Sequence, residues 1–208
     1  MTDHTYEAAQ IKVLEFHASI RKRPSMYFGV GQGDPALPAS VLCAVAIHAL
    51  HPATGVAREH TLRTVIEITD SLSFTMTMDQ PHSWEASGAP ALGYYDSLLG
   101  PEWWLPAAAA ALCERAAVEM WCEGRGFRQD LAGIRPLTAP QEFEPPTGSG
   151  TKVTFALDPD YVGAASALPT DLEHLDLHGP HCSAAAGPGH VIIRDLRDGG
   201  TDREVLYR

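Results

Sequence analysis

The sequence has few basic residues, and lysine is the scarcer kind. Lysine and arginine together number 15 against 26 aspartates and glutamates, so the formal net charge is −11. The only lysines are Lys12, Lys22 and Lys152. Proteins that bind DNA or RNA by themselves usually carry a basic face, so we expect no nucleic-acid partner. Few lysines beside abundant alanine, glycine and proline are typical of a GC-rich, actinobacterial genome.

Paired cysteines, long apolar runs and a signal sequence are also missing. Cys43, Cys113, Cys122 and Cys182 are scattered without a C-x-x-C pair, which argues against a disulfide framework or a cysteine-based zinc site. No apolar run reaches the roughly 18 residues of a membrane helix. Residues 1–10 lack the apolar core of a signal peptide. We therefore expect a cytoplasmic protein with free thiols and no membrane contact.

What the sequence does contain predicts one α+β domain over residues 1–208. Its composition, 45% hydrophobic and 20% charged, is that of a globular protein. Helical spacing of apolar residues predicts helices over 10–21, 37–50, 106–114 and 171–177. Alternation predicts strands over 64–68, 73–78, 117–122, 127–131, 151–157, 190–195 and 204–207, with a short extended piece at 26–29. Segregated helices and antiparallel hairpins indicate a mixed β-sheet with helices packed on one face.

Several segments resemble the ATPase domain of the gyrase B (and topoisomerase IV) subunit family. Residues 11–15 read IKVLE and residues 20–29 read IRKRPSMYFG, similar to the opening motif of that family. TGSGTKVTF at 147–155 and VIIRDLRDG at 191–199 resemble later strands of the same domain, in the right order. The resemblance spans about residues 6–208 and implies the GHKL (Bergerat) fold. The family's transducer and DNA-cleavage modules have no counterpart here, so we expect no topoisomerase activity.

The residues that carry ATP chemistry in this family are replaced. The resemblance puts Cys43 in place of the glutamate that activates water and Ile47 in place of the asparagine that binds magnesium. A thiol and an aliphatic side chain serve neither purpose. The glycine-rich phosphate lid is replaced by GPEWWLP at 100–106, which lacks the flexible backbone amides that wrap phosphate. We therefore expect no ATP, no magnesium and no ATP hydrolysis.

The motif that holds adenine in the family is kept at one position. Asp79 stands where an aspartate binds the exocyclic amine of adenine, while Pro81 and Ser83 replace two glycines. His82 replaces the family's arginine, and His51 replaces the carboxylate that pairs with that arginine. Imidazoles can donate, accept or bind protons near neutral pH.

The resemblance thus predicts a small-molecule cleft of apolar and aromatic character. Its expected lining is Cys43, Ile47, His51, Asp79, His82, Ser149 and Thr151, with Trp103 and Trp104 as a roof. Cys43, Ile47 and His51 share one helix face at i, i+4 and i+8. Cys43 as nucleophile with His51 or His82 as base is the catalytic hypothesis, and the other residues are candidates for ligand binding.

Simpler interpretations stay open for each of these residues. Cys43 can be a small core residue, His51 a helix-end histidine, and Asp79 the cap of a turn. The two tryptophans can be core or interface residues. A metal site is geometrically possible at Cys43, His51, Asp79 and His82, but their spacing matches no zinc signature. The three histidines of segment 174–181 are explained by a solvated helix end, so we assign no metal. Those histidines are His174, His178 and His181.

The resulting hypothesis is a domain repurposed to bind, and in one version transform, a small molecule other than ATP. Specialised metabolism such as natural-product biosynthesis is the expected setting. The alternative is a pseudo-ATPase with residual nucleotide binding that works by contact with a gyrase subunit or with itself. The N-terminal arm, residues 1–6, reaches across a dimer in the family, so a homodimer is part of that alternative.

Overall fold

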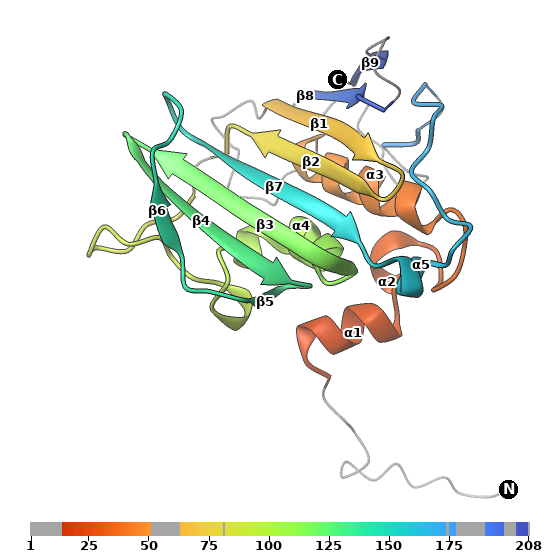
Figure 1. Cartoon of the computed structure of the whole chain (residues 1–208), viewed down its shortest axis with the longest axis horizontal. Coiled ribbons are helices and arrows are strands. Elements are labelled where there is room, and N and C mark those ends of the chain that lie inside the picture. Colours follow the sequence, from red (N-terminus) through yellow and green to blue (C-terminus); the bar gives the residue numbers. More distant parts are fainter. Residues whose placement is uncertain are drawn as a thin grey trace, which may run out of the picture.

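One mixed β-sheet organises the protein in its computed structural model, which describes residues 14–50, 63–80, 82–173, 175–177, 190–197 and 203–207 (Figure 1). Within these residues nine strands form the sheet. They are β1 (Arg63–Asp70), β2 (Ser73–Met78), β3 (Cys113–Cys122), β4 (Arg125–Ala132), β5 (Arg135–Pro136), β6 (Gln141–Phe143), β7 (Gly150–Leu157), β8 (His190–Asp195) and β9 (Arg203–Tyr207). Eight follow the order β5-β4-β3-β7-β2-β1-β8-β9, and β6 pairs with β4. The β1–β8 pair is parallel and the other pairs are antiparallel.

Two of the helices cover the far face of this sheet in the view of Figure 1. The helical elements are α1 (Phe16–Lys22), α2 (Ser25–Phe28), α3 (Leu37–Leu50), the 3-10 turns η2 (Tyr94–Asp96) and η3 (Pro101–Trp103), α4 (Trp104–Ala110) and α5 (Pro159–Val162). Helix α3 contacts β1 and β8, while α4 contacts β3 and β7. The fold is therefore α+β with a mixed sheet, as the sequence predicted.

Alternation along the strands separates a buried face from an open one. In β7, Val153, Phe155 and Leu157 are buried, whereas Lys152 and Thr154 lie on the other face and are half-buried. The rings of Phe74 and Phe155 stack across the β2–β7 pair, with centroids 4.7 Å apart. Burial of such aromatic and aliphatic side chains is the main favourable term that holds α3 and α4 to the sheet.

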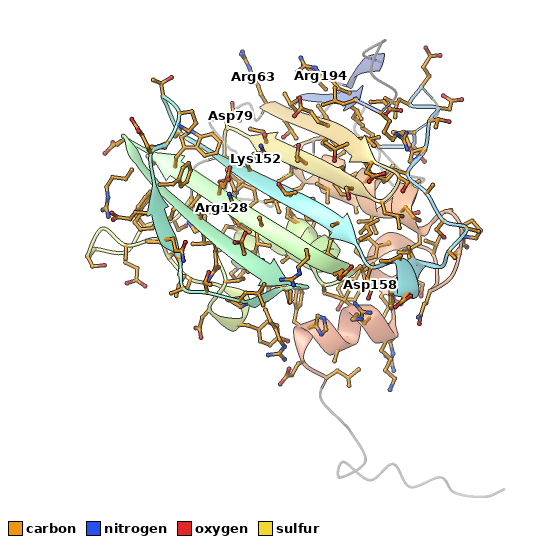
Figure 2. All side chains as sticks on the ribbon, viewed as in Figure 1. Arg63, Asp79, Arg128, Lys152, Asp158 and Arg194 are labelled. Atoms are coloured by element: carbon orange, nitrogen blue, oxygen red, sulfur yellow. The ribbon has the colours of Figure 1, made fainter. Side chains whose placement is uncertain are left out.

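The open face carries charged side chains in cross-strand pairs (Figure 2). The guanidinium group of Arg128 on β4 lies 3.5 Å from the carboxylate of Glu119 on β3. That of Arg194 on β8 lies 3.8 Å from the carboxylate of Glu67 on β1. Pairs this exposed contribute little to stability, but they mark the face that water reaches.

Several predicted elements are confirmed and three are corrected. The helix 37–50, both early strands and the two later hairpins are present. The extended piece predicted at 26–29 is wrong, because α2 is a helical turn that follows Pro24 and ends at Gly29 with φ +78°. Proline fits the start of a helix and glycine its left-handed end. Helix α1 begins at Phe16, and residues 10–13 of its predicted range lie outside the described residues.

The other two corrections concern the predicted helices 106–114 and 171–177. Helix α4 ends at Ala110, and β3 already begins at Cys113. The described residues 171–173 and 175–177 contain no helix. No helix in the described ranges is long and apolar enough to span a membrane.

Candidate functional site

Helix α3 has two faces that matter for the predicted site. Cys43 and Ile47 are half-buried on one face, while His48 is 2% exposed on another. Five residues along an α-helix correspond to a rotation of about 140°, so the Cys43 and His48 side chains leave the helix in different directions. The two faces therefore have different surroundings.

The face of Cys43 and Ile47 lines a groove of about 450 Å³. We call it the α2–α3 groove; its lining residues are Tyr27, Phe28, Gly29, Ala36, Ala39, Ser40, Cys43, Ala44, Ile47, Leu175 and Asp176. Two residues predicted to line one ligand site thus do lie together in one groove. The other predicted residues that the structure describes do not appear in its lining.

The Cys43 thiol is poorly suited to nucleophilic attack. Burial, and to a smaller extent the negative charge of Asp176, raise the pKa of Cys43 to about 12. Because the thiolate is the reactive form, a thiol with this pKa is inert near neutral pH. Cys43 is a free thiol that serves here as a small, polarisable groove residue.

The opposite face of α3 packs against the chain that follows β2. The His48 Nε2 and Gln80 Oε1 atoms are hydrogen-bonded at 3.0 Å, and the His48 ring centroid lies 5.2 Å from that of Trp103. Burial lowers the pKa of His48 to about 4, against a smaller opposite effect of the Gln80 hydrogen bond. The imidazole is therefore neutral at physiological pH. Thr151 is also buried here, and its hydroxyl donates to the Gln80 carbonyl oxygen at 3.5 Å.

This cluster of His48, Gln80, Trp103 and Thr151 lies between α3 and the end of β2, where the resemblance predicts a small-molecule cleft. Gln80 and Trp103 are fully buried. Their Nε2 and Nε1 groups have no hydrogen-bond partner among the described residues. Sequence reasoning missed both His48 and Gln80. For Gln80 a signal was available, because alternation continued from β2 places residues 76, 78 and 80 on the buried face and 79 on the other.

Asp79 directly follows β2, an interior strand of the sheet. Its Oδ1 accepts a hydrogen bond from the backbone N–H of Arg63 at 2.8 Å, and its own N–H donates to the Arg63 carbonyl oxygen at 3.2 Å. Figure 2 shows the two residues side by side at the adjoining ends of β1 and β2. These contacts join the end of β2 to the start of β1 and do not cap a turn.

His82 is buried with both ring nitrogens beside backbone carbonyl oxygens. Nδ1 lies 2.8 Å from the Ser83 oxygen and Nε2 lies 2.7 Å from the Leu98 oxygen. Both ring nitrogens of His82 are thus directed at backbone carbonyl oxygens of its own loop rather than at a thiol. Cys43, Asp79 and His82 thus each have neighbours of their own. No contact in the described part of the chain supports the pairing of Cys43 with His82.

The remaining predicted site residues fall in three environments. Trp103 is fully buried, which matches its interpretation as a core residue, and Trp104 is 39% exposed on α4. Ser149 is exposed just before β7. His51 lies outside the described residues, as do Pro81 and the three histidines of segment 174–181. The described ranges hold no cluster of three or more histidine, cysteine, aspartate or glutamate side chains that could bind a metal ion.

Comparison with known proteins adds no family assignment. The chain matches no protein-family model, and no curated protein matches it significantly.

Proposed function

We propose that this chain is a GHKL domain similar to that of the gyrase B subunit, that it does not hydrolyse ATP, and that it binds a small, largely apolar molecule in the α2–α3 groove. The mixed sheet, with α3 packed on the parallel strands β1 and β8, supports the proposed fold. The sequence similarities at 11–29, 147–155 and 191–199 point the same way.

The segment that stands in place of the nucleotide lid supports the absence of ATP turnover. Pro101–Trp103 forms a 3-10 turn, and Leu98, Leu99 and Trp103 are fully buried. A lid that wraps phosphate needs backbone amides that are free to move and to donate. A segment held by buried side chains offers neither. Cys43 and Ile47 likewise supply no general base and no magnesium ligand.

The observation that carries the binding proposal is the chemical character of the α3 face in the groove. Ala39, Cys43 and Ile47 are only partly buried, although a helix face that meets water usually carries charged residues. The groove volume of about 450 Å³ is in the range of small-molecule sites. Ser40 and Asp176 add polar groups to an otherwise apolar lining. The site therefore fits an apolar body with a neutral or cationic polar group.

Binding rather than catalysis is the function that this groove supports. Its thiol is held protonated by burial, and no imidazole is among the lining residues that the structure describes. The protein's charge of −11 also disfavours an anionic ligand.

Fluorescence titration with the neutral apolar dye N-phenyl-1-naphthylamine tests this proposal. We expect the dye to bind, and Ile47→Trp, which fills the groove, to weaken its binding by roughly tenfold or more. Leu92→Trp adds the same side chain at an exposed position outside the groove and should leave binding unchanged. Equal dye binding in all three proteins, or none in the wild type, would refute the groove as a ligand site. Dimerisation that Ile47→Trp abolishes would instead favour the protein-contact alternative.

A further inference from the structure

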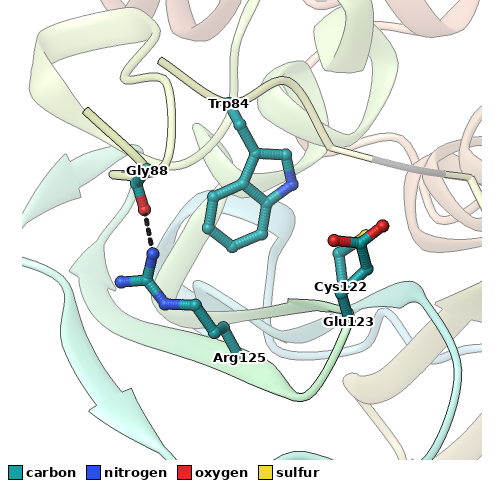
Figure 3. A pocket seen from close by; sticks show the side chains of 5 residues that line it. All are labelled: Trp84, Gly88, Cys122, Glu123 and Arg125. Carbon is teal, nitrogen blue, oxygen red and sulfur yellow. Dashed lines mark hydrogen bonds between the residues drawn. The ribbon is translucent and has the colours of Figure 1, made fainter. Parts of the chain in front are cut away.

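The geometry points to a second binding site, for a flat aromatic amide, at the tip of the β3–β4 hairpin. A pocket of about 400 Å³ lies there between the hairpin turn and the loop after β2. We call it the hairpin-tip pocket; it is lined by Trp84, Gly88, Cys122, Glu123 and Arg125 (Figure 3). None of these residues belongs to the α2–α3 groove, so this site stands apart from the proposed function.

The aromatic wall of the pocket is held in place from two sides. Trp84 forms a β-bridge with Pro90, and the intervening turn is closed by a hydrogen bond from the Glu85 N–H to the Ala89 oxygen at 2.9 Å. Behind it, the ring of Phe127 meets the indole edge-on, with centroids 5.7 Å apart. A fixed aromatic face is a ready surface for a second flat ring.

Arg125 fixes the neighbouring wall. Its guanidinium group donates to the Gly88 carbonyl oxygen and pairs with the carboxylate of Glu142 at 3.1 Å. The guanidinium carbon lies 5.8 Å from the Trp84 ring centroid and 5.2 Å from that of Phe127. The cation thus lies over both aromatic rings, and its charge is already paired with Glu142.

One polar group of this wall has no partner. The Trp84 Nε1–H is buried and makes no hydrogen bond within the described chain. Figure 3 shows this nitrogen on the edge of the indole that faces Cys122 and Glu123. A buried indole N–H normally finds an acceptor, so the pocket lacks an oxygen or nitrogen that a ligand can supply.

Glu123 offers the complementary group across the pocket. It is exposed, and its φ of +51° lies in the left-handed region that few residues other than glycine adopt. With Gly124 at φ +79°, it forms the two-residue turn of the hairpin. The carboxylate can only accept hydrogen bonds, so a ligand that displaces water from it must offer a donor.

A primary amide on an aromatic ring meets both requirements at once. Its carbonyl oxygen accepts from the Trp84 N–H, its nitrogen donates to the Glu123 carboxylate, and its ring packs against the part of the indole that Arg125 leaves uncovered. A carboxylate in the same position would be repelled by Glu123, and an amidine has no acceptor for the indole. The ligand class is therefore a neutral aromatic carboxamide or lactam.

Three ligands of nearly equal shape test this assignment in the full chain: benzamide, benzoate and benzamidine. The readout is the ¹⁵N–¹H resonance of the Trp84 indole, identified by its loss in Trp84→Phe. We expect benzamide at millimolar concentration to shift this resonance in a saturable way, and benzoate and benzamidine to bind roughly tenfold more weakly or not at all.

Matched variants separate the site from non-specific stacking. Glu123→Ala should weaken benzamide binding by roughly tenfold, as expected for the loss of one hydrogen bond to a charged group. Glu114→Ala, at the opposite end of β3, should leave it unchanged. The proposal is overturned if benzamide does not shift the Trp84 resonance, if benzoate binds equally well, or if Glu123→Ala binds as the wild type does.

Discussion

The packing of His48 against Gln80 leads to a quantitative prediction about acid stability. Burial lowers the pKa of His48 from the ordinary histidine value of 6.5 to about 4. The folded state therefore binds a proton less readily than the unfolded state, and stability must fall as the pH drops from 6.5 toward 4. Since one pKa unit corresponds to about 1.4 kcal/mol, this single group should destabilise the fold by about 2 kcal/mol between pH 7 and pH 5, and by about 3 kcal/mol at pH 4.

Urea unfolding at several pH values measures this effect, with His48→Gln as the matched variant. Glutamine can still donate to Gln80 but does not titrate, so other groups contribute equally in both proteins. We expect the wild type to lose about 2 kcal/mol more than His48→Gln between pH 7 and pH 5. Equal losses would mean that His48 is hydrated in the folded state. The space between α3 and β2 would then be an open cleft rather than a packed one.

Three further predictions concern α1, the groove thiol and the loop before α4. Arg21→Met should lower the free energy of unfolding by roughly 1–2 kcal/mol, because the 2.8 Å ion pair of Arg21 with Asp158 is lost. Urea unfolding measures this change, and an unchanged midpoint would contradict the prediction. Burial alone would raise the pKa of Asp158, but Arg21 and backbone amides lower it overall. The stability difference between the wild type and Arg21→Met should therefore shrink as the pH falls through the acid range and Asp158 becomes protonated. Because its pKa is raised, Cys43 should react with iodoacetamide at pH 8 on the order of a thousandfold more slowly than free cysteine does. Peptide mass spectrometry measures the rate, and a rate comparable to that of free cysteine would show that the thiol is exposed. Gly93→Ala should lower the free energy of unfolding by roughly 1–3 kcal/mol, since a Cβ at this position would lie 2.2 Å from the Gly100 backbone. Gly31→Ala is the control, because a Cβ there meets open space. Equal stabilities of the two variants would refute this prediction.

Local periodicity was enough to predict most elements of the fold. The apolar run of α3 and the alternation in β1, β2 and β7 depend on neighbouring residues, and these elements appear where the pattern places them. The parallel pairing of β1 with β8 joins residues such as Ile66 and Ile193, and nothing local in the sequence indicates it. α2 was missed because four residues are too few to show a helical period.

The site was harder to predict because it depends on which face of its helix or strand each side chain lies on. Helical spacing predicted that Cys43 and Ile47 share one helix face, and both line the α2–α3 groove, but it gave no reason to consider His48. Asp79 was chosen by motif, while the strand alternation places Gln80 on the buried side. The hairpin-tip pocket brings Trp84 next to Arg125, and their contact arises only from the tertiary fold.

The central claim is that the α2–α3 groove binds an apolar molecule while ATP is neither bound nor hydrolysed. The most direct measurement follows the δ1-methyl NMR resonance of Ile47, assigned through Ile47→Val, during separate titrations with N-phenyl-1-naphthylamine and with magnesium-ATP. The account predicts a saturable shift with the dye and no shift with magnesium-ATP. A shift with magnesium-ATP, accompanied by phosphate release and without any response to the dye, would contradict it.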